Sequence, residues 1–228
     1  MPGLPPARSV LAVCAHPDDE SFGLGAALSA LAEQGSEVAV LCFTHGEAST
    51  LGASCGLLRE VRAGELSAAA QVLGFSHVES LDHADGSLAE VPLEVLAGEV
   101  ARVVAEQRAE LLVVFDVGGV TGHPDHCRAT EAALAAGVWP VLAWALPERV
   151  ARALSDEFGG VFIGRADSEL DFSIALDRSR QHQAIACHAS QARDNPVLRR
   201  RLELQGDREV FRWLGPSRGV PPLMSPVP

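Results

Sequence analysis

The sequence predicts an α/β fold: a Rossmann-like, mostly parallel sheet with helices on both faces and a less regular C-terminal part. Short apolar segments alternate with helix-length amphipathic segments along most of the 228 residues. The apolar segments are continuous rather than alternating, which is typical of strands buried on both faces of a parallel sheet. The length, without repeats or linkers, favours a single domain at 1–228, with a core at about 9–191 and proline-rich tails.

Five apolar segments of strand length predict the main strands of this sheet. In chain order they are residues 9–15, 37–43, 77–81, 110–115 and 138–146. The helices predicted between them are residues 22–34, 57–73, 91–108 and 126–136. Gly35 and Gly74 directly follow the first two helices, as helix-terminating glycines often do. On the second helix Leu66, Ala69 and Leu73 share one face, as a helix packed on a sheet requires.

The alternation of strand-like and helix-like segments becomes less regular after Glu148. Strands are predicted near 161–164 and 170–175, and helices near 178–193 and 196–204. Eight of the 14 prolines lie in the first six and last thirteen residues, which predicts irregular structure at both ends.

The charged residues exclude several classes of function. All 18 basic residues are arginine, against 30 acidic residues, and the formal net charge is -12. A chain without lysine or tyrosine cannot use a Schiff-base lysine, a phosphate-loop lysine or a tyrosine nucleophile. The acidic excess argues against a nucleic-acid partner, because phosphate binding needs a basic surface, and a solvated helix face explains the triplet at 199–201.

The sequence predicts a cytoplasmic protein without a membrane partner. No segment reads as a signal peptide, and the longest apolar segment, 132–146, is interrupted by Gly137 and Pro140. The five cysteines form no C-x-x-C pair, which fits reduced thiols. A homo-oligomer is compatible with these features.

A cluster of polar residues, His16-Pro17-Asp18-Asp19-Glu20, directly follows the first predicted strand. Three carboxylates beside an imidazole repel one another, and a bound cation relieves this repulsion most simply. His16 and Asp19 are three residues apart and can share a metal, which leaves Asp18 free. Taken alone, Asp18 and Asp19 fit equally well as N-terminal caps of the following helix.

A second cluster, His123-Pro124-Asp125-His126, follows the fourth predicted strand and a glycine-rich loop. Ligands of such sheets bind outside the carboxyl ends of the strands, so the segments after Ala15, Phe43, Leu81 and Phe115 should share one crevice. The two clusters should therefore converge on one metal site. His45 and His83 also follow strand ends and are weaker substrate candidates, whereas His77, His182 and His188 fit surface or core roles.

The two segments AHPDDES (15–21) and GHPDH (122–126) resemble the two signatures of a family of metal-dependent deacetylases. This is the N-acetylglucosaminyl-phosphatidylinositol de-N-acetylase (PIG-L/LmbE-like) family, which includes mycothiol and bacillithiol pathway enzymes. Further segments similar to family motifs are Thr44 to Glu47, Arg62 to Gly74, Asp85-Gly86 and His188 to Gln191. The resemblance covers about residues 9–191.

The resemblance implies a zinc-dependent hydrolase that removes acetyl from a small-molecule N-acetylglucosamine-type conjugate, with low-molecular-weight thiol precursors among the candidates. It makes His16, Asp19 and His126 the metal ligands. Two histidines and a carboxylate with an open position suit Zn²⁺, which acidifies a bound water. Asp18 would then be the general base that takes a proton from this water and lets it attack the acetamide.

Four other residues acquire roles from the resemblance. His123 would stabilise the tetrahedral oxyanion as an imidazolium or protonate the departing amine. Asp125 would orient a histidine, as metal-binding histidines usually require. Arg62 and Asp85 match substrate-binding positions, and a salt bridge or a turn explains either equally well. Some family members have a tyrosine where this chain has Thr121, so His123 and the metal would stabilise the oxyanion without it.

Three alternatives stay open at this point. The same ligands could hold Fe²⁺ as a facial triad, but Asp18 would then have no purpose. A family member could bind metal without turnover, although metal binding alone needs neither Asp18 nor His123. A nucleotide-binding Rossmann protein is disfavoured, because Gly23-Leu24-Gly25 lacks a third glycine and lies beside an acidic cluster.

Overall fold

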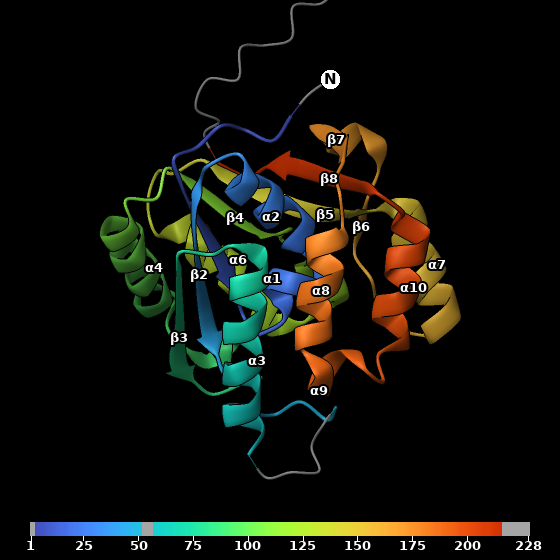
Figure 1. Cartoon of the computed structure of the whole chain (residues 1–228), viewed down its shortest axis with the longest axis horizontal. Helices are drawn as coiled ribbons and strands as arrows, with labels where there is room; N and C mark the ends of the chain where they lie inside the picture. Colours follow the sequence, from blue (N-terminus) through green and yellow to red (C-terminus); the bar gives the residue numbers. More distant parts are fainter. Residues whose placement is uncertain (1–2, 52–56, 216–228) are drawn as a thin grey trace, which may run out of the picture.

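One mixed sheet of eight strands runs through the computed structural model, which describes residues 3–51 and 57–215 (Figure 1). The strands are β1 (Ser9–Cys14), β2 (Glu37–Thr44), β3 (His77–His83), β4 (Leu111–Phe115), β5 (Val141–Pro147), β6 (Gly164–Arg165), β7 (Phe172–Ala175) and β8 (Arg208–Trp213). Their order across the sheet is β3-β2-β1-β4-β5-β8-β7, with β6 paired to β5. Strands β1 to β6 pair in parallel, and β8 pairs antiparallel with β5 and β7. The predicted mostly parallel α/β fold is confirmed.

Helices cover both faces of this sheet. They are α1 (Asp19–Phe22), α2 (Gly25–Glu33), α3 (Leu58–Leu73), α4 (Leu93–Gln107), α5 (Gly119–Gly122), α6 (Pro124–Ala135), α7 (Glu148–Phe158), α8 (Ser179–Cys187), α9 (Ala189–Ala192) and α10 (Pro196–Gln205), with short 3-10 turns η2 (Leu88–Glu90) and η3 (Asp167–Glu169). Leu11 and Val13 of β1 belong to the apolar layer under α4 and α6, and Val10 and Ala12 to the layer under α2, α3 and α7. Since alternate side chains of β1 enter opposite layers, the strand is buried throughout and is apolar after Ser9.

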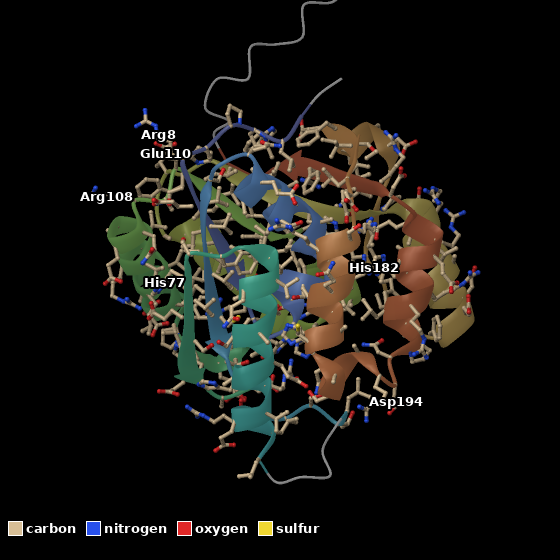
Figure 2. All side chains as sticks on the ribbon, in the orientation of Figure 1. Arg8, His77, Arg108, Glu110, His182 and Asp194 are labelled. Carbon is tan, nitrogen blue, oxygen red and sulfur yellow. The ribbon has the colours of Figure 1, made fainter. Side chains whose placement is uncertain are left out.

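The amino ends of the central strands lie at the edge opposite the polar clusters. The backbone N–H of Arg8, just before β1, donates to Oε2 of Glu110, just before β4, at 3.0 Å. Figure 2 marks this edge of the molecule with Arg8, Arg108 and Glu110. Across the described residues, no helix combines the length and the apolar composition needed to cross a bilayer.

Two predicted helices are each divided in the structure. The helix predicted at 22–34 is replaced by α1 and α2, and the break contains Gly23. A Cβ on Gly23 would lie 2.3 Å from Cε1 of Phe115 and 3.2 Å from Trp144, so the chain passes the aromatic side chains only as glycine. The helix predicted at 178–193 is divided into α8 and α9 at His188, whose φ and ψ of −82° and 53° are not helical.

The prediction was incomplete after residue 147. Helix α7 was missed because only Val150, Ala151 and Leu154 of its eleven residues are buried. Strand β8 was missed because Arg208, Glu209 and Arg212 interrupt its apolar residues. The strand predicted at 161–164 was largely wrong, since β6 consists of Gly164 and Arg165 alone. The proline-rich last thirteen residues lie outside the described residues.

Candidate active site

The carboxyl ends of β1 and β4 bring the two His-Pro clusters together. β1 pairs with β4 on one side and β2 on the other, so the chain reverses its order across the sheet at β1. A cavity of about 590 Å³ opens there. Its lining includes His16, Ala48, Asp85 and Thr121, which follow the four predicted strand ends. The predicted shared crevice is therefore confirmed.

Three potential ligand atoms converge in this cavity. Nδ1 of His16 lies 3.1 Å from Nε2 of His126, which lies 3.2 Å from Oδ1 of Asp19. The distance from His16 Nδ1 to Asp19 Oδ2 is 3.9 Å. Donor atoms about 2.0–2.1 Å from a tetrahedral zinc ion lie about 3.3 Å apart, so a zinc-sized ion fits between them. Two histidine nitrogens and one carboxylate oxygen also match the donor set of hydrolytic zinc sites.

The surrounding backbone holds these side chains in place. Nδ1 of His126 lies 3.0 Å from the carbonyl of Gly119, which leaves Nε2 directed at the other two ligands. Oδ2 of Asp19 accepts from the backbone N–H groups of Ala15 and His16, both at 3.0 Å. Burial opposes ionisation of Asp19, but His126 and His16 outweigh it and hold the pKa of this carboxyl well below its usual range. The carboxylate is therefore ionised and ready to bind a cation.

Asp125 lies behind His16 and is fully buried. Its Oδ2 lies 3.3 Å from Nε2 of His16 and accepts from Gly86 N–H at 2.7 Å, and its Oδ1 accepts from Leu88 N–H at 3.1 Å. Oδ1 of Asp85 is 3.0 Å from the same His16 nitrogen. Burial would lower the pKa of His16, but these two carboxylates raise it to about 10. Asp125 thus contacts the candidate metal site only through His16, the arrangement that fixes a ligand ring.

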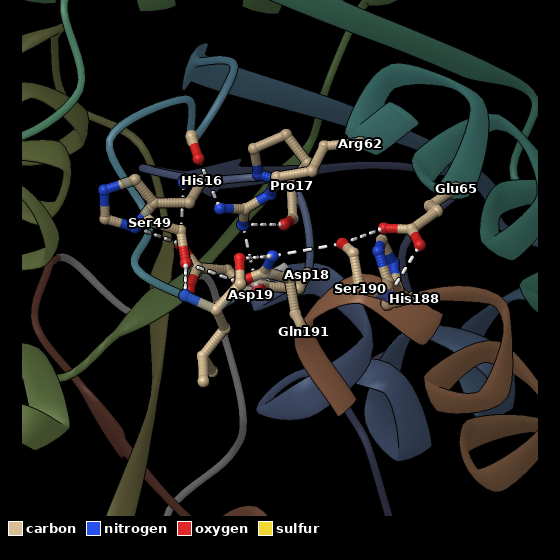
Figure 3. A network of polar contacts seen from close by, with 12 residues as sticks. His16, Pro17, Asp18, Asp19, Ser49, Arg62, Glu65, His188, Ser190 and Gln191 are labelled. Atoms are coloured by element: carbon tan, nitrogen blue, oxygen red, sulfur yellow. Dashed lines mark hydrogen bonds and ion pairs between the residues drawn. The ribbon is translucent and has the colours of Figure 1, made fainter. Parts of the chain in front are cut away.

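Asp18 faces the cavity beside the ligands. Its φ of 124° is rare for a residue with a side chain. Burial raises the pKa of Asp18 to about 6, although Arg62 opposes this shift. Arg62 donates to Oδ2 of Asp18 at 3.0 Å, to Gly46 O at 2.6 Å and to Pro17 O (Figure 3). Arg62 therefore lines the cavity but uses most of its donors to hold the loop and Asp18.

His123 lies within ring contact of both histidine ligands. Its centroid is 4.9 Å from that of His16 and 5.0 Å from that of His126. Its Nδ1 accepts the backbone N–H of Asp125 at 3.2 Å as the N-terminal cap of α6. Burial, together with His126 and His16, lowers the pKa of His123. The neutral ring therefore carries its proton on Nε2. Thr121 also lines the cavity, with Oγ1 3.4 Å from His126 Nδ1.

The other predicted histidines lie outside the cavity lining. Nε2 of His45 is 3.1 Å from Asp82, and that of His83 is 2.8 Å from Glu99. His188 is fully buried, with Nε2 2.7 Å from Oε1 of Glu20. The weaker substrate candidates His45 and His83 thus contact carboxylates outside the cavity lining.

Sequence reasoning missed the aromatic part of the cavity. Phe115, Trp144 and Phe162 line it together with Leu198 and Arg201 of α10. Phe115 and Trp144 were assigned only to apolar strands, and Arg201 to a solvated helix face. That last prediction was wrong, because Arg201 is 7% exposed. No local pattern could reveal this, since the contacts of Arg201 with Phe22 and Trp144 join distant segments.

Comparison with known proteins gives a consistent result. A family model described as PIG-L, GlcNAc-PI de-N-acetylase, matches residues 11–137. A curated 1D-myo-inositol 2-acetamido-2-deoxy-alpha-D-glucopyranoside deacetylase of Kineococcus radiotolerans is 35% identical over 57% of this chain and 44% of its own length. The protein of the same name from Salinispora arenicola is 30% identical over 85% of this chain and 79% of its own. The chain thus spans about half of the first relative and most of the second.

Solved structures share the fold. The 4-carboxy-2-hydroxymuconate hydratase GalB of Pseudomonas putida has a TM-score of 0.69 at 20% identity, covering 93% of this chain and 98% of its own. N,N'-diacetylchitobiose deacetylase of Pyrococcus horikoshii has a TM-score of 0.66 at 22% identity, covering 91% of this chain and 84% of its own. The zinc-inhibited form of teicoplanin deacetylase Orf2 has a TM-score of 0.65 at 20% identity, covering 90% of this chain and 97% of its own. Since one of these proteins is a hydratase and two are deacetylases, the shared fold does not define the reaction.

Proposed function

Because this chain belongs to the PIG-L (GlcNAc-PI de-N-acetylase) family, we propose that it is a metal-dependent N-deacetylase. Its substrate is an N-acetylglucosamine-type glycoconjugate, and its cofactor is Zn²⁺. The names of the curated relatives support a 2-acetamido sugar linked to a polyol. The free thiols of Cys14 and Cys42, on neighbouring strands, are compatible with a cytoplasmic location.

One observation carries the proposal. Three potential ligand atoms, from His16, Asp19 and His126, lie 3.1–3.9 Å apart. The carboxylate of Asp18 lies beside them, although metal binding by these three residues does not require it. A site that only stored metal would not require this second carboxylate in a strained conformation. A hydrolase does require it, because the attacking water must lose a proton.

Zn²⁺ at these donors would lower the pKa of a water molecule and polarise the acetamide carbonyl. The carboxylate of Asp18 accepts the proton of the attacking water, and Arg62 holds Oδ2 of Asp18 during this transfer. Because Arg62 donates to Oδ2, we assign this step to Oδ1 of Asp18. Arg62 thereby acts as a positioning residue for the base, in addition to any contact with substrate.

His123 is suited to stabilise the oxyanion as a neutral hydrogen-bond donor. Its Nδ1 already accepts the Asp125 N–H, so Nε2 carries the proton that faces the cavity. Protonating Nδ1 would break that cap, and the lowered pKa of His123 also opposes the imidazolium form. We therefore favour oxyanion stabilisation by His123 over proton donation to the amine. The proton that Asp18 has accepted is then the one available to the departing amine.

The test is an amine-release screen with protein loaded with Zn²⁺ or Fe²⁺. N-acetylglucosaminyl inositol comes first, followed by other N-acetylglucosamine conjugates. We expect one equivalent of acetate and one of free amine, with the zinc form active. Activity of the iron form alone would replace zinc in the proposal. Protein with metal bound that released neither product from any conjugate would overturn the deacetylase assignment and favour a member without turnover.

A further inference from the structure

We propose that Arg201, lying over the ring of Trp144, forms a subsite of the cavity for an anionic group of the substrate. The inference rests on the proposed function and narrows it to N-acetylated sugars that carry a phosphate or carboxylate. It is independent of the metal ligands, because α10 and β5 contribute none of them.

Arg201 differs from the other buried arginines. Among the described residues three arginines are buried, namely Arg62, Arg178 and Arg201. Arg62 forms an ion pair with Asp18, and Arg178 with Glu209. Arg201 has only neutral acceptors within the described part of the chain: Gln205 Oε1, at 2.7 Å from NH1, and Phe22 O. Its guanidinium carbon lies 5.3 Å from the centroid of the Trp144 ring.

The nearest acidic group is already occupied by other donors. Glu209 is fully buried and accepts from Arg178, from Nε1 of Trp144 at 2.5 Å and from Nε2 of Gln205 at 2.8 Å. The cluster therefore holds two guanidinium groups, those of Arg178 and Arg201, and one carboxylate, which leaves one net positive charge. Burial lowers the pKa of Arg201 to about 10, which still leaves it cationic at neutral pH. Buried cations normally have an anionic partner, and here the cavity is the place where one can bind.

The cavity gives this cation access to substrate. Arg201, Trp144 and Phe22 line the same cavity as His16 and Asp18. A row of ring contacts connects the two regions: His126 to Phe115 at 5.1 Å, then Phe115 to Trp144 at 5.4 Å. Asp18, Asp19 and Asp85 line the metal region, whereas Arg201 supplies a cation beyond the two rings. A substrate with a neutral acetamide at one end and an oxyanion at the other matches this polarity.

Phosphate and carboxylate are the groups that a planar guanidinium recognises best, through paired N–H donors. Because the net charge of -12 repels anions, a local cation such as Arg201 favours the binding of an anionic substrate. The arginine fork also distinguishes the site from a simple point charge, because lysine would supply charge without the paired donors.

The experiment compares neutral and anionic substrates on zinc-loaded protein. The substrates are methyl N-acetylglucosaminide, N-acetylglucosamine 1-phosphate and the carboxymethyl glycoside of N-acetylglucosamine. In the wild type we expect kcat/KM for the better anionic substrate to exceed that of the neutral one by roughly 10- to 100-fold. Arg201→Gln should remove this preference by raising KM for the anionic substrates. The kcat/KM for the neutral substrate should stay within about twofold of the wild-type value. Arg201→Lys should recover only part of this preference. The exposed Arg199→Gln on the same helix is the control and should behave as wild type.

Calorimetric binding of the same three compounds separates this inference from the proposed function. If nothing is hydrolysed but anionic compounds bind more tightly to the wild type than to Arg201→Gln, the subsite stands and the deacetylase proposal fails. Phosphate binding through zinc alone would persist in Arg201→Gln, which retains the metal ligands, and would overturn the subsite. Equal binding of all three compounds by the wild type would overturn it without any variant. If Arg201→Gln does not fold, Arg201→Lys replaces it, and an undiminished preference for anionic compounds in Arg201→Lys would overturn the subsite.

Discussion

Asp18 has a strained backbone conformation, and its neighbours fix the orientation of its side chain. Its backbone φ of 124° costs about 1–3 kcal/mol, and such strain persists only where neighbours enforce it. The Asp18 N–H donates to Oε2 of Glu20 at 2.8 Å, and Arg62 holds the side chain. Asp19, one residue later, is thereby free to turn toward His126. The conformation thus turns two adjacent carboxylates in different directions, as the proposed roles of Asp18 as base and Asp19 as ligand require.

Replacing Asp18 with asparagine should separate metal binding from turnover. Asp18→Asn preserves the shape but cannot accept a proton, so we expect kcat to fall by about 10²–10⁴-fold. Zinc content should stay at the wild-type value, because His16, Asp19 and His126 are intact. Activity assays combined with metal analysis provide the measurement, with Asp19→Asn as the variant that should lose zinc. A fully active Asp18→Asn protein would remove Asp18 from the mechanism.

Zinc affinity should depend strongly on pH. The carboxylates of Asp125 and Asp85 raise the pKa of metal-free His16 to about 10, so its ring is protonated at neutral pH. A metal binds the neutral ring, and each bound ion must therefore displace this proton. The apparent zinc affinity should rise by about tenfold or more for each pH unit between pH 6 and 8. Competition with a chromophoric chelator, corrected for its own protonation, measures this slope, and a flat profile would contradict the assignment.

The convergence of the candidate metal ligands was predictable from sequence for a topological reason. His16 follows β1, and His126 lies in α6, which follows β4 after the glycine-rich loop. Strands that pair side by side in parallel bring their carboxyl ends together. Arg201 and the Glu20–His188 pair were not predictable in this way. The bonds from His188 to Glu20 and from Arg201 to Phe22 O join residues 168 and 179 positions apart, and nothing local distinguishes a buried arginine or histidine from an exposed one.

At the scale of elements, the break between α1 and α2 shapes the aromatic wall of the cavity. The sequence pattern predicted one helix here, because it reflects the spacing of apolar residues along the chain. It does not show whether the folded structure has room for a side chain at a given position. Gly23 lies where the rings of Phe115 and Trp144 pass the chain. Strand β8 was missed for the complementary reason: its charged residue Glu209 finds its partner Arg178 only in the folded structure.

Adding a methyl group at this break should therefore destabilise the protein. Gly23→Ala would place Cβ 2.3 Å from Cε1 of Phe115, and overpacking of this kind costs about 1–3 kcal/mol. Gly64 in α3 is the matched control, since it is helical and a Cβ there meets nothing within 4 Å. Gly64→Ala should stabilise the protein by about 1 kcal/mol. Urea unfolding of both metal-free variants tests the contrast, and equal effects of the two substitutions would contradict this account of the break.

At the scale of the whole molecule, the last helices close the cavity through side chains. Gln191 accepts from Ser49 at 2.7 Å and donates to Leu51 O at 3.1 Å, and Ser190 bonds Glu65 (Figure 3). His188, between α8 and α9, bonds Glu20 beside the candidate base. The C-terminal part was the least regular by sequence, yet it provides the second wall of the cavity. Its order depends on these few polar contacts more than on apolar periodicity.

The Glu20–His188 pair should make this closure pH-dependent. Burial lowers the pKa of His188, but Glu20 and the nearby Asp18 and Glu65 outweigh it and raise the pKa. A histidine whose pKa is raised by folding contributes its stabilisation fully below its unfolded pKa of about 6.5. That contribution is lost as the pH rises through the pKa of the folded state. His188→Ala should therefore cost about 3–5 kcal/mol near pH 6, because it leaves the buried carboxylate of Glu20 without its cation.

The pH dependence separates this ionic loss from the cavity left by the smaller side chain. A cavity costs the same free energy at every pH, so the difference between wild type and His188→Ala should shrink toward a constant above the folded pKa. Urea unfolding from pH 5.5 to 9.5 measures this difference in the free energy of unfolding between wild type and His188→Ala. The exposed His182 on α8 supplies the control, and His182→Ala should change stability by less than about 0.5 kcal/mol throughout. A constant difference for His188→Ala across this range would mean that packing alone, and not the ion pair, attaches the C-terminal helices to the base.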